Sequence, residues 1–197
     1  MTSFYERPET ERIALTERAI VEQRTLHERW TALAAPEAAG WNARAALAAE
    51  WLGGSGSVLD LGCGTMSLET YLADGVRYYP SDVVARDGRT LVCDYNLQPP
   101  PVIDADAAVC LGLLEYLHQP LDFMRALAAH YPLCIVDYCT VDAPKPLVPR
   151  RAHGWVNDFT HAGIERIFTA AGWRITASLM ADDFQFLWRL ARPQHGA

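Results

Sequence analysis

The stretch Val58-Leu59-Asp60-Leu61-Gly62-Cys63-Gly64-Thr65-Met66-Ser67-Leu68-Glu69 passes from an apolar segment into a glycine turn within a few residues. Its apolar start is typical of a buried parallel strand. The two glycines allow a left-handed backbone and the close approach of a ligand. A helix is expected over residues 67–73, with its unpaired amide groups facing the crevice where open α/β sheets bind ligands. The stretch therefore predicts a strand, turn and helix that together bind a ligand.

The next two predicted strands each end in a carboxylate. Residues 76–82 end in Asp82, about twenty residues beyond Asp60, the spacing at which a βαβ unit places an acidic side chain beside a ribose. Residues 90–95 form a short strand that ends in Asp94 and Tyr95. An alternative role for Asp94 is to start the turn that follows. Taken with the glycine turn, these carboxylates predict a ligand that contains a nucleoside.

These residues resemble motif I and the following strand ends of the class I S-adenosylmethionine-dependent methyltransferases. Motif I is an acidic residue, any residue, then Gly-x-Gly-x-Gly; Asp60, Gly62 and Gly64 match it, and Met66 replaces the third glycine. The resemblance implies S-adenosylmethionine as cofactor, with its methionine end at the motif, its ribose at Asp82 and its adenine amine at Asp94. The cofactor-binding residues that it implies are Asp60, Gly62, Cys63, Gly64, Asp82, Val83, Asp94, Tyr95, Leu111 and Gly112.

The remaining pattern extends the resemblance over most of the chain. Further strands are expected around residues 104–113, 133–138, 173–179 and 184–190, with helices over 121–129 and 160–171. The implied fold is α/β: a Rossmann-like three-layer sandwich with a seven-stranded, mostly parallel sheet whose last strand is antiparallel. N-terminal helices are expected over residues 9–34 and 42–51. We therefore predict a helical lid segment over residues 1–56 and an S-adenosylmethionine-binding methyltransferase domain over residues 57–197.

The leading helices carry aromatic side chains that suit two roles. In the methyltransferases that this chain resembles, such helices often cover the cofactor crevice, where His27, Trp30, Trp41 and Trp51 would line a lid. The alternative is that these tryptophans pack on the sheet. Exposed aromatic residues there would also suit a homodimer.

Residues 140–156 are expected to supply most substrate contacts. This proline-rich connection is long for a compact domain, and such loops are often functional. Arg150 and Arg151 would clamp an anionic group of the acceptor, or else lie in solvent. Asn157 would orient a polar group or cap a helix. The predicted substrate-binding residues are Trp30, Arg150, Arg151, Trp155 and Asn157.

Methyl transfer is an in-line displacement, so the protein has to position a nucleophile and remove its proton where necessary. The predicted catalytic residues are His153, Tyr116 and His118. His153 leads this set because imidazole titrates near neutral pH and its loop is expected at the pocket mouth.

Composition narrows the class of acceptor and the location. The net charge of −7 disfavours a general nucleic-acid binder, which would present a basic face to phosphates. No apolar run approaches the roughly 20 residues of a membrane span, and no signal pattern begins the chain, so a cytoplasmic protein is expected. Five cysteines without Cys-x-x-Cys spacing indicate reduced, buried thiols and no metal site.

The sequence thus predicts a methyltransferase that acts on an O, N or S nucleophile of a small-molecule metabolite or biosynthetic intermediate. Two alternatives remain. A non-catalytic S-adenosylmethionine-binding regulatory or partner subunit is favoured by Met66. The other is a different nucleoside-dependent enzyme, such as an aminopropyl transferase or a nicotinamide enzyme.

Overall fold

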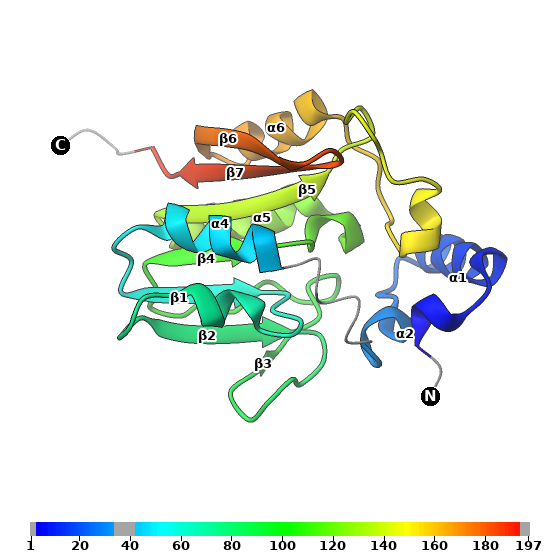
Figure 1. Ribbon diagram of the computed structural model, residues 1–197, viewed down its shortest axis with the longest axis horizontal. Helices are drawn as coiled ribbons and strands as arrows, with labels where there is room; N and C mark the ends of the chain where they lie inside the picture. Colours follow the sequence, from blue (N-terminus) through cyan, green and yellow to red (C-terminus); the bar gives the residue numbers. More distant parts are fainter. Residues whose placement is uncertain (1–2, 34–41, 194–197) are drawn as a thin grey trace.

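The computed structural model describes residues 3–33 and 42–193, and its centre is a seven-stranded sheet (Figure 1). The strand order is β3-β2-β1-β4-β5-β7-β6, in which β7 alone runs antiparallel to its neighbours. This confirms the predicted sheet with its antiparallel last strand. The strands are β1 Ser57–Leu61, β2 Arg77–Asp82, β3 Leu91–Val92, β4 Ala107–Cys110, β5 Leu133–Cys139, β6 Arg174–Asp182 and β7 Gln185–Ala191.

The strand order reverses between β1 and β4. β1 pairs with β2 on one side and with β4 on the other. From β1 the chain moves outward through β2 to β3, and from β4 it moves outward in the opposite direction to β5. The connections that leave β1 and β4 therefore diverge at the carboxyl ends of these strands, where open α/β sheets bind ligands. The glycine turn after β1 and residues 111–112 after β4 flank this crevice.

Helices cover both faces of the sheet. α5 Pro120–His130 and α6 His161–Ala170 pack on one face, where Leu59 and Leu61 point. α4 Asn42–Leu52 and the 3₁₀ turn η2 Ser67–Tyr71 pack on the other face, where Val58 and Val109 point. Successive residues of β1 thus enter opposite cores, as the pleat requires, and the result is the predicted three-layer sandwich.

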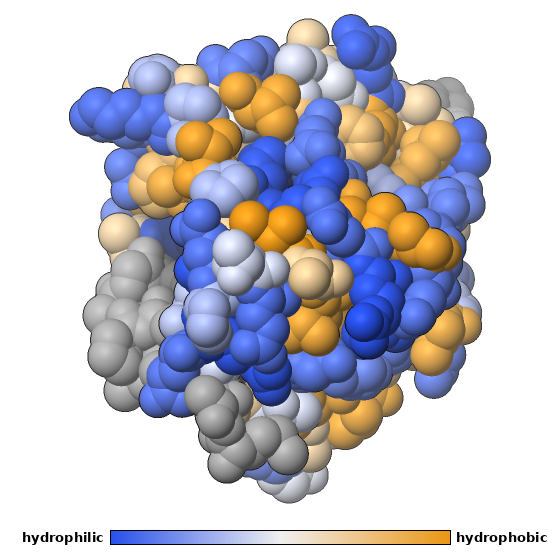
Figure 2. Space-filling model, turned by 90° about the vertical axis from the view of Figure 1, so that its right-hand side faces the viewer, coloured by the Kyte–Doolittle hydropathy of each residue, from blue (hydrophilic) through white to orange (hydrophobic). Residues whose placement is uncertain are grey.

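The leading segment lies beyond the carboxyl ends of the parallel strands. It contains η1 Phe4–Glu6, α1 Glu9–Glu22 and α2 His27–Trp30, and α1 packs against η4 Arg150–His153 (Figure 1). α4, by contrast, belongs to the sheet's own helical layer. Figure 2 views the side that carries α1, α2 and η4, and its hydrophobic residues lie in separate groups among hydrophilic ones. The predicted lid residue Trp41 lies outside the described residues.

Two predicted helices are shorter than the sequence indicated. The helix over residues 9–34 breaks at Gln23, which has a φ of 51°, and a single turn, α2, follows. The break lets Leu26 join Phe4 and Ala19 in a small core and brings the Thr25 hydroxyl within 2.5 Å of Asp94 Oδ1. These contacts join segments far apart in the chain, so the helical period did not reveal them.

The helix predicted over residues 67–73 is the 3₁₀ turn η2 instead. Only Leu68 of its five residues is buried, so little apolar surface is present to hold a longer helix. The third predicted strand is likewise shortened to β3, whose two residues are exposed at the sheet edge. Another 3₁₀ turn, η3 Leu114–Tyr116, carries the chain from β4 toward α5.

Among the described residues, no helix has the length and apolar composition that crossing a bilayer requires.

Candidate functional site

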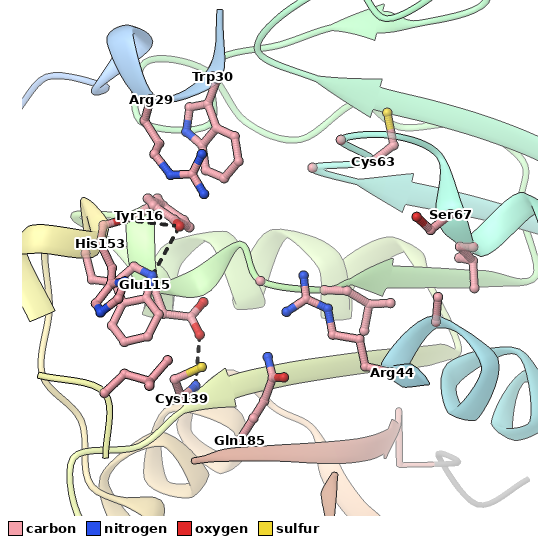
Figure 3. Close-up of a pocket in the computed structure, with 18 of the residues that line it drawn as sticks. Arg29, Trp30, Arg44, Cys63, Ser67, Glu115, Tyr116, Cys139, His153 and Gln185 are labelled. Atoms are coloured by element: carbon pink, nitrogen blue, oxygen red, sulfur yellow. Dashed lines mark hydrogen bonds between the residues drawn. The ribbon is translucent and has the colours of Figure 1, made fainter. Parts of the chain in front are cut away.

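A cavity of about 250 Å³ opens at the carboxyl ends of β1 and β4 (Figure 3). Its walls come from the glycine turn, the start of α4, the exits of β4 and β5, the leading segment and η4. The structure therefore collects residues from parts of the chain that lie far apart in the sequence. Ten residues predicted from the sequence line it: Trp30, Asp60, Gly62, Cys63, Gly64, Leu111, Gly112, Tyr116, His153 and Trp155.

A second, smaller cavity of about 50 Å³ adjoins the first. The two have four lining residues in common: Trp30, Gly62, Gly112 and Tyr116. The smaller cavity is lined by the four residues predicted for the adenosine end of the cofactor: Asp82, Val83, Asp94 and Tyr95. The residues predicted for the two ends of the cofactor thus lie on either side of the shared wall.

The glycine turn has the backbone that its sequence requires. Gly62 and Gly64 have φ values of 73° and 52°, which L-residues with a Cβ atom rarely adopt. A Cβ atom on Gly62 would lie 3.2 Å from Leu113 Cδ1. The Gly62 and Cys63 amides donate to the Ser81 carbonyl (2.8 and 3.0 Å), which ties the turn to β2. The turn is therefore fixed at the crevice by its own backbone.

Met66, which stands where motif I has its third glycine, also has a left-handed backbone with a φ of 58°. Its sulfur lies 3.6 Å from Arg89 Nη2, and it is not among the residues that line either cavity. The side chain at this position therefore leaves the crevice walls unchanged. The cost of the substitution is the conformational strain of a non-glycine residue in this region.

Replacing Met66 with glycine is expected to raise the free energy of unfolding by about 1 kcal/mol, because glycine adopts this conformation without strain. Affinity for S-adenosylhomocysteine should stay within twofold of that of the unmodified protein. Urea unfolding and calorimetric titration measure the two quantities. Thr70→Gly, in the same turn, is the control and should destabilise the protein; a weaker ligand affinity in Met66→Gly would contradict the placement of Met66 outside the site.

Asp82 is a buried carboxylate that organises the end of β2. Its Oδ2 accepts from the Gly64 amide (2.9 Å), and its Oδ1 accepts from the Val84 amide (3.0 Å) and from Arg86 Nη2 (3.1 Å). A carboxylate offers about four acceptor positions. Three are used here, and the group still borders the smaller cavity.

Asp94 links the smaller cavity to the leading segment. Its Oδ1 accepts from the Thr25 hydroxyl and from the Asn96 amide (3.1 Å). Its buried Oδ2 has no hydrogen-bond partner among the described residues, although His27 Nε2 lies 3.4 Å away. A buried acceptor without a donor is costly, and an exocyclic amine entering this cavity would supply one.

Asp60 lies at the cavity floor beneath the glycine turn. Burial, together with the charge of Asp82, raises the pKa of its carboxyl to about 7, against the opposing effects of the hydrogen bond from the Tyr78 hydroxyl (2.6 Å) and the charge of Arg44. A carboxyl that titrates near neutrality in a cavity is typical of a functional site.

Aromatic rings form the opposite side of the larger cavity. The Trp30 and Tyr116 rings meet edge to face with centroids 4.6 Å apart, and the His153 and Trp155 rings lie 4.9 Å apart. Trp155 Nε1 donates to the Tyr116 hydroxyl (3.1 Å). Desolvation and the charges of Arg12, Arg29 and Arg150 lower the pKa of His153, so its imidazole is neutral at pH 7.

The other predicted acceptor-side residues point elsewhere. His118 lies outside both cavities, with its Nε2 atom 3.0 Å from the Arg24 carbonyl oxygen. Arg150 and Arg151 both pair with Asp158 and hold the loop together. Asn157 donates to the carbonyls of Leu114 and Leu117 (2.8 and 3.0 Å).

Several cavity residues were not among the predicted site residues. Arg44 reaches in from α4, with Nη1 3.4 Å from Asp137 Oδ2, and a Cβ atom on Gly112 would lie 2.8 Å from Arg44 Nη2. Glu115 is 1% exposed and borders the same space. Glu115 lies in the segment that leaves β4, and Arg44 lies in an alanine-rich helix whose sequence showed no sign of a site. Tyr5, Arg29, Cys139 and Gln185 also line this cavity.

A family profile described as a methyltransferase domain matches residues 32–178, more than half of the chain. The chain belongs to this family. With its glycine turn and strand order, the methyltransferase is of class I and uses S-adenosylmethionine, as the motif predicted. No curated protein matches the chain.

Solved structures share the methyltransferase's fold. One is Burkholderia thailandensis 1,6-didemethyltoxoflavin-N1-methyltransferase with bound 1,6-didemethyltoxoflavin and S-adenosylhomocysteine, with a TM-score of 0.66, 18% identity, and coverage of 94% of this chain and 91% of that one. Another is the mitomycin 7-O-methyltransferase, with a TM-score of 0.66, 15% identity, and coverage of 96% and 70%. A third is an O-methyltransferase from neocarzinostatin biosynthesis, in complex with S-adenosylhomocysteine and 1,4-dihydroxy-2-naphthoic acid, with a TM-score of 0.59, 12% identity, and coverage of 94% and 69%. At these identities the likeness concerns the fold.

Proposed function

We propose that this methyltransferase transfers a methyl group to an O, N or S nucleophile of a small molecule. The observation that carries this proposal is the pair of cavities that meet at Gly62 and Gly112: Asp82 and Asp94 line the smaller one, and the rings of His153 and Trp155 line the larger one. A ligand with a nucleoside fits the smaller cavity. A flat or apolar acceptor fits the larger one.

The residues of the smaller cavity would hold the adenosine of the cofactor. Asp82 has one acceptor position left for a ribose hydroxyl, and the unsatisfied Oδ2 of Asp94 would accept a hydrogen bond from the adenine amine. Tyr95, which lines the same cavity and donates to the Ser81 hydroxyl (2.7 Å), would border the ring.

The residues of the larger cavity would hold the methionine end and the acceptor. The Asp60 carboxylate suits the cofactor's ammonium group, and the Arg44 guanidinium suits its carboxylate. When bound, S-adenosylmethionine supplies an electrophilic methyl group. Tyr116 and the neutral His153 border the acceptor side, where His153 would take a proton from the nucleophile. Trp30 and Trp155 would pack against the acceptor.

A small-molecule acceptor is favoured over a nucleic acid by the size of the cavity and by the net charge of −7. The leading segment, which contributes Tyr5, Arg29 and Trp30, narrows the mouth of the site. A cytoplasmic location and a homodimer stay predictions from the sequence, as does the division into a lid segment and a catalytic domain at residue 56.

Calorimetric titration with S-adenosylmethionine, S-adenosylhomocysteine and NAD tests the cofactor assignment. Micromolar binding of the two sulfur ligands is expected, with no heat from NAD. Formation of S-adenosylhomocysteine in the presence of candidate acceptors then separates a methyltransferase from a non-catalytic binding subunit. Binding of NAD, or of none of the three ligands, would overturn the proposal.

A further inference from the structure

Glu115 is the buried carboxylate of the larger cavity whose bonding is incomplete. Its Oε1 accepts from the Cys139 amide (2.8 Å), which joins η3 to the end of β5. Its Oε2 is buried and has no hydrogen-bond partner in residues 3–33 and 42–193. Figure 3 shows this carboxylate in the space bordered by Arg44, Tyr116, His153 and Cys139. An acceptor atom in such a place requires a donor to offset its desolvation.

Burial raises the pKa of the Glu115 carboxyl, and two nearby guanidinium groups oppose this rise without hydrogen-bonding to Oε2. Arg44 approaches from α4 and Arg150 from η4, while Asp137 on β5 carries a like charge. Asp137 is itself satisfied by the Gly112 amide (2.5 Å) and by Gln185 Nε2 (2.9 Å). Of these two neighbouring carboxylates, Glu115 is therefore the one left with an open acceptor position.

The aromatic residues beside Glu115 favour a flat molecule as the source of that hydrogen-bond donor. Trp30 and Tyr116 form one pair of rings there, and His153 and Trp155 form a second pair, with centroids 4.6 and 4.9 Å apart. Guanidinium groups lie over two of these rings: Arg29 lies 4.5 Å from the Trp30 centroid and Arg150 lies 4.5 Å from the Trp155 centroid. Rings held in this way are suited to pack against another flat aromatic surface.

We propose that Glu115 binds the acceptor of this methyltransferase, and that its Oε2 accepts a hydrogen bond from an N–H or O–H group on a planar aromatic or heteroaromatic molecule. This inference rests on the proposed function and specifies the acceptor for the same site. Glu115 would then distinguish an unmethylated acceptor, which has a donor to offer, from its methylated product, which has lost it.

The test compares two flat probes, 2-naphthol and 2-methoxynaphthalene. In the second, a methyl group replaces the hydroxyl hydrogen of the first, so the hydrogen-bond donor is lost. Binding to the protein saturated with S-adenosylhomocysteine is measured by calorimetry. The unmodified protein is expected to bind 2-naphthol at least tenfold more tightly. In Glu115→Gln, the amide oxygen keeps the Cys139 contact and an NH₂ group replaces Oε2, so the preference should fall below twofold or invert.

Asp106→Asn is the matched control, because Asp106 lies at the opposite end of the strands from the cavity. Its Oδ2 accepts hydrogen bonds from the Gly56 amide and the Ser57 hydroxyl (2.8 and 3.0 Å). It should keep the tenfold preference. If Glu115→Gln fails to fold, Glu115→Asp, whose shorter carboxylate cannot reach both positions, should still reduce the preference. Absence of any preference in the unmodified protein, or its persistence in Glu115→Gln, would overturn the inference. Failure of the proposed function would instead appear as loss of S-adenosylhomocysteine binding.

Discussion

Asp82→Asn is expected to bind S-adenosylhomocysteine about tenfold more weakly than the unmodified protein, because the charge-assisted hydrogen bond that its fourth acceptor position can make to the ribose would be lost, at about 1.5 kcal/mol. The amide retains one acceptor oxygen, but its NH₂ group would face, as a second donor, either the Gly64 amide or the Val84 amide and Arg86. Calorimetric titration measures the affinity. Asp87→Asn, which removes an exposed carboxylate nearby, should leave it within twofold.

A structural role of Asp82 must be separated from ribose binding, because the same carboxylate anchors Gly64, Val84 and Arg86. A second ligand that lacks one ribose hydroxyl separates the two roles. The 2′-deoxy analogue of S-adenosylhomocysteine should bind the unmodified protein at least tenfold more weakly than the parent ligand, and Asp82→Asn should show almost no difference between the two. An equal penalty in both proteins would show that Asp82 acts only by holding the turn.

The cofactor half of the site could be predicted because its residues follow one another along the chain. Asp60, Gly62 and Gly64 belong to one strand and turn, and Asp82 ends the neighbouring strand. Their relative placement follows from parallel pairing and a short connection, which the sequence encodes locally. The structure accordingly places Asp82 and Asp94 in one cavity and Asp60 in the adjoining one.

The acceptor half could not be predicted to the same extent because tertiary contacts decide it. Arg150 and Arg151 suggested an anion clamp, but Asp158 pairs with both of them. η3 turns the chain after β4 so that Tyr116 faces the cavity, whereas His118 packs against the Arg24 carbonyl. Arg44 enters the site only because α4 crosses the sheet with this side chain at the crevice. Each outcome depends on a partner far away in the sequence.

The affinity for S-adenosylmethionine is expected to rise about tenfold per pH unit between pH 5 and pH 7 and then to level off. The reason is that the Asp60 pKa, raised to about 7 by burial, leaves this carboxyl protonated below neutrality, whereas the cationic ligand favours its ionised form. Calorimetry in two buffers of different ionisation enthalpy should also show release of a proton on binding at pH 6. Asp60→Asn should show neither effect, while Glu69→Gln, which removes a half-buried neighbouring charge, should show both.

The same shift has a consequence for stability in the absence of ligand. Between the ordinary carboxyl pKa of 3.8 and about 7, the folded state holds a proton at Asp60 that the unfolded state has lost. The contribution of this proton to the free energy of unfolding is therefore complete below pH 3.8. It is lost as the pH rises toward 7, by up to about 4 kcal/mol. Asp60→Asn should then resist urea better than the unmodified protein at pH 8 and equally at pH 4. A carboxylate kept at this cost is consistent with selection for a cationic ligand rather than for the fold, and equal stability of the two proteins at pH 8 would contradict that interpretation.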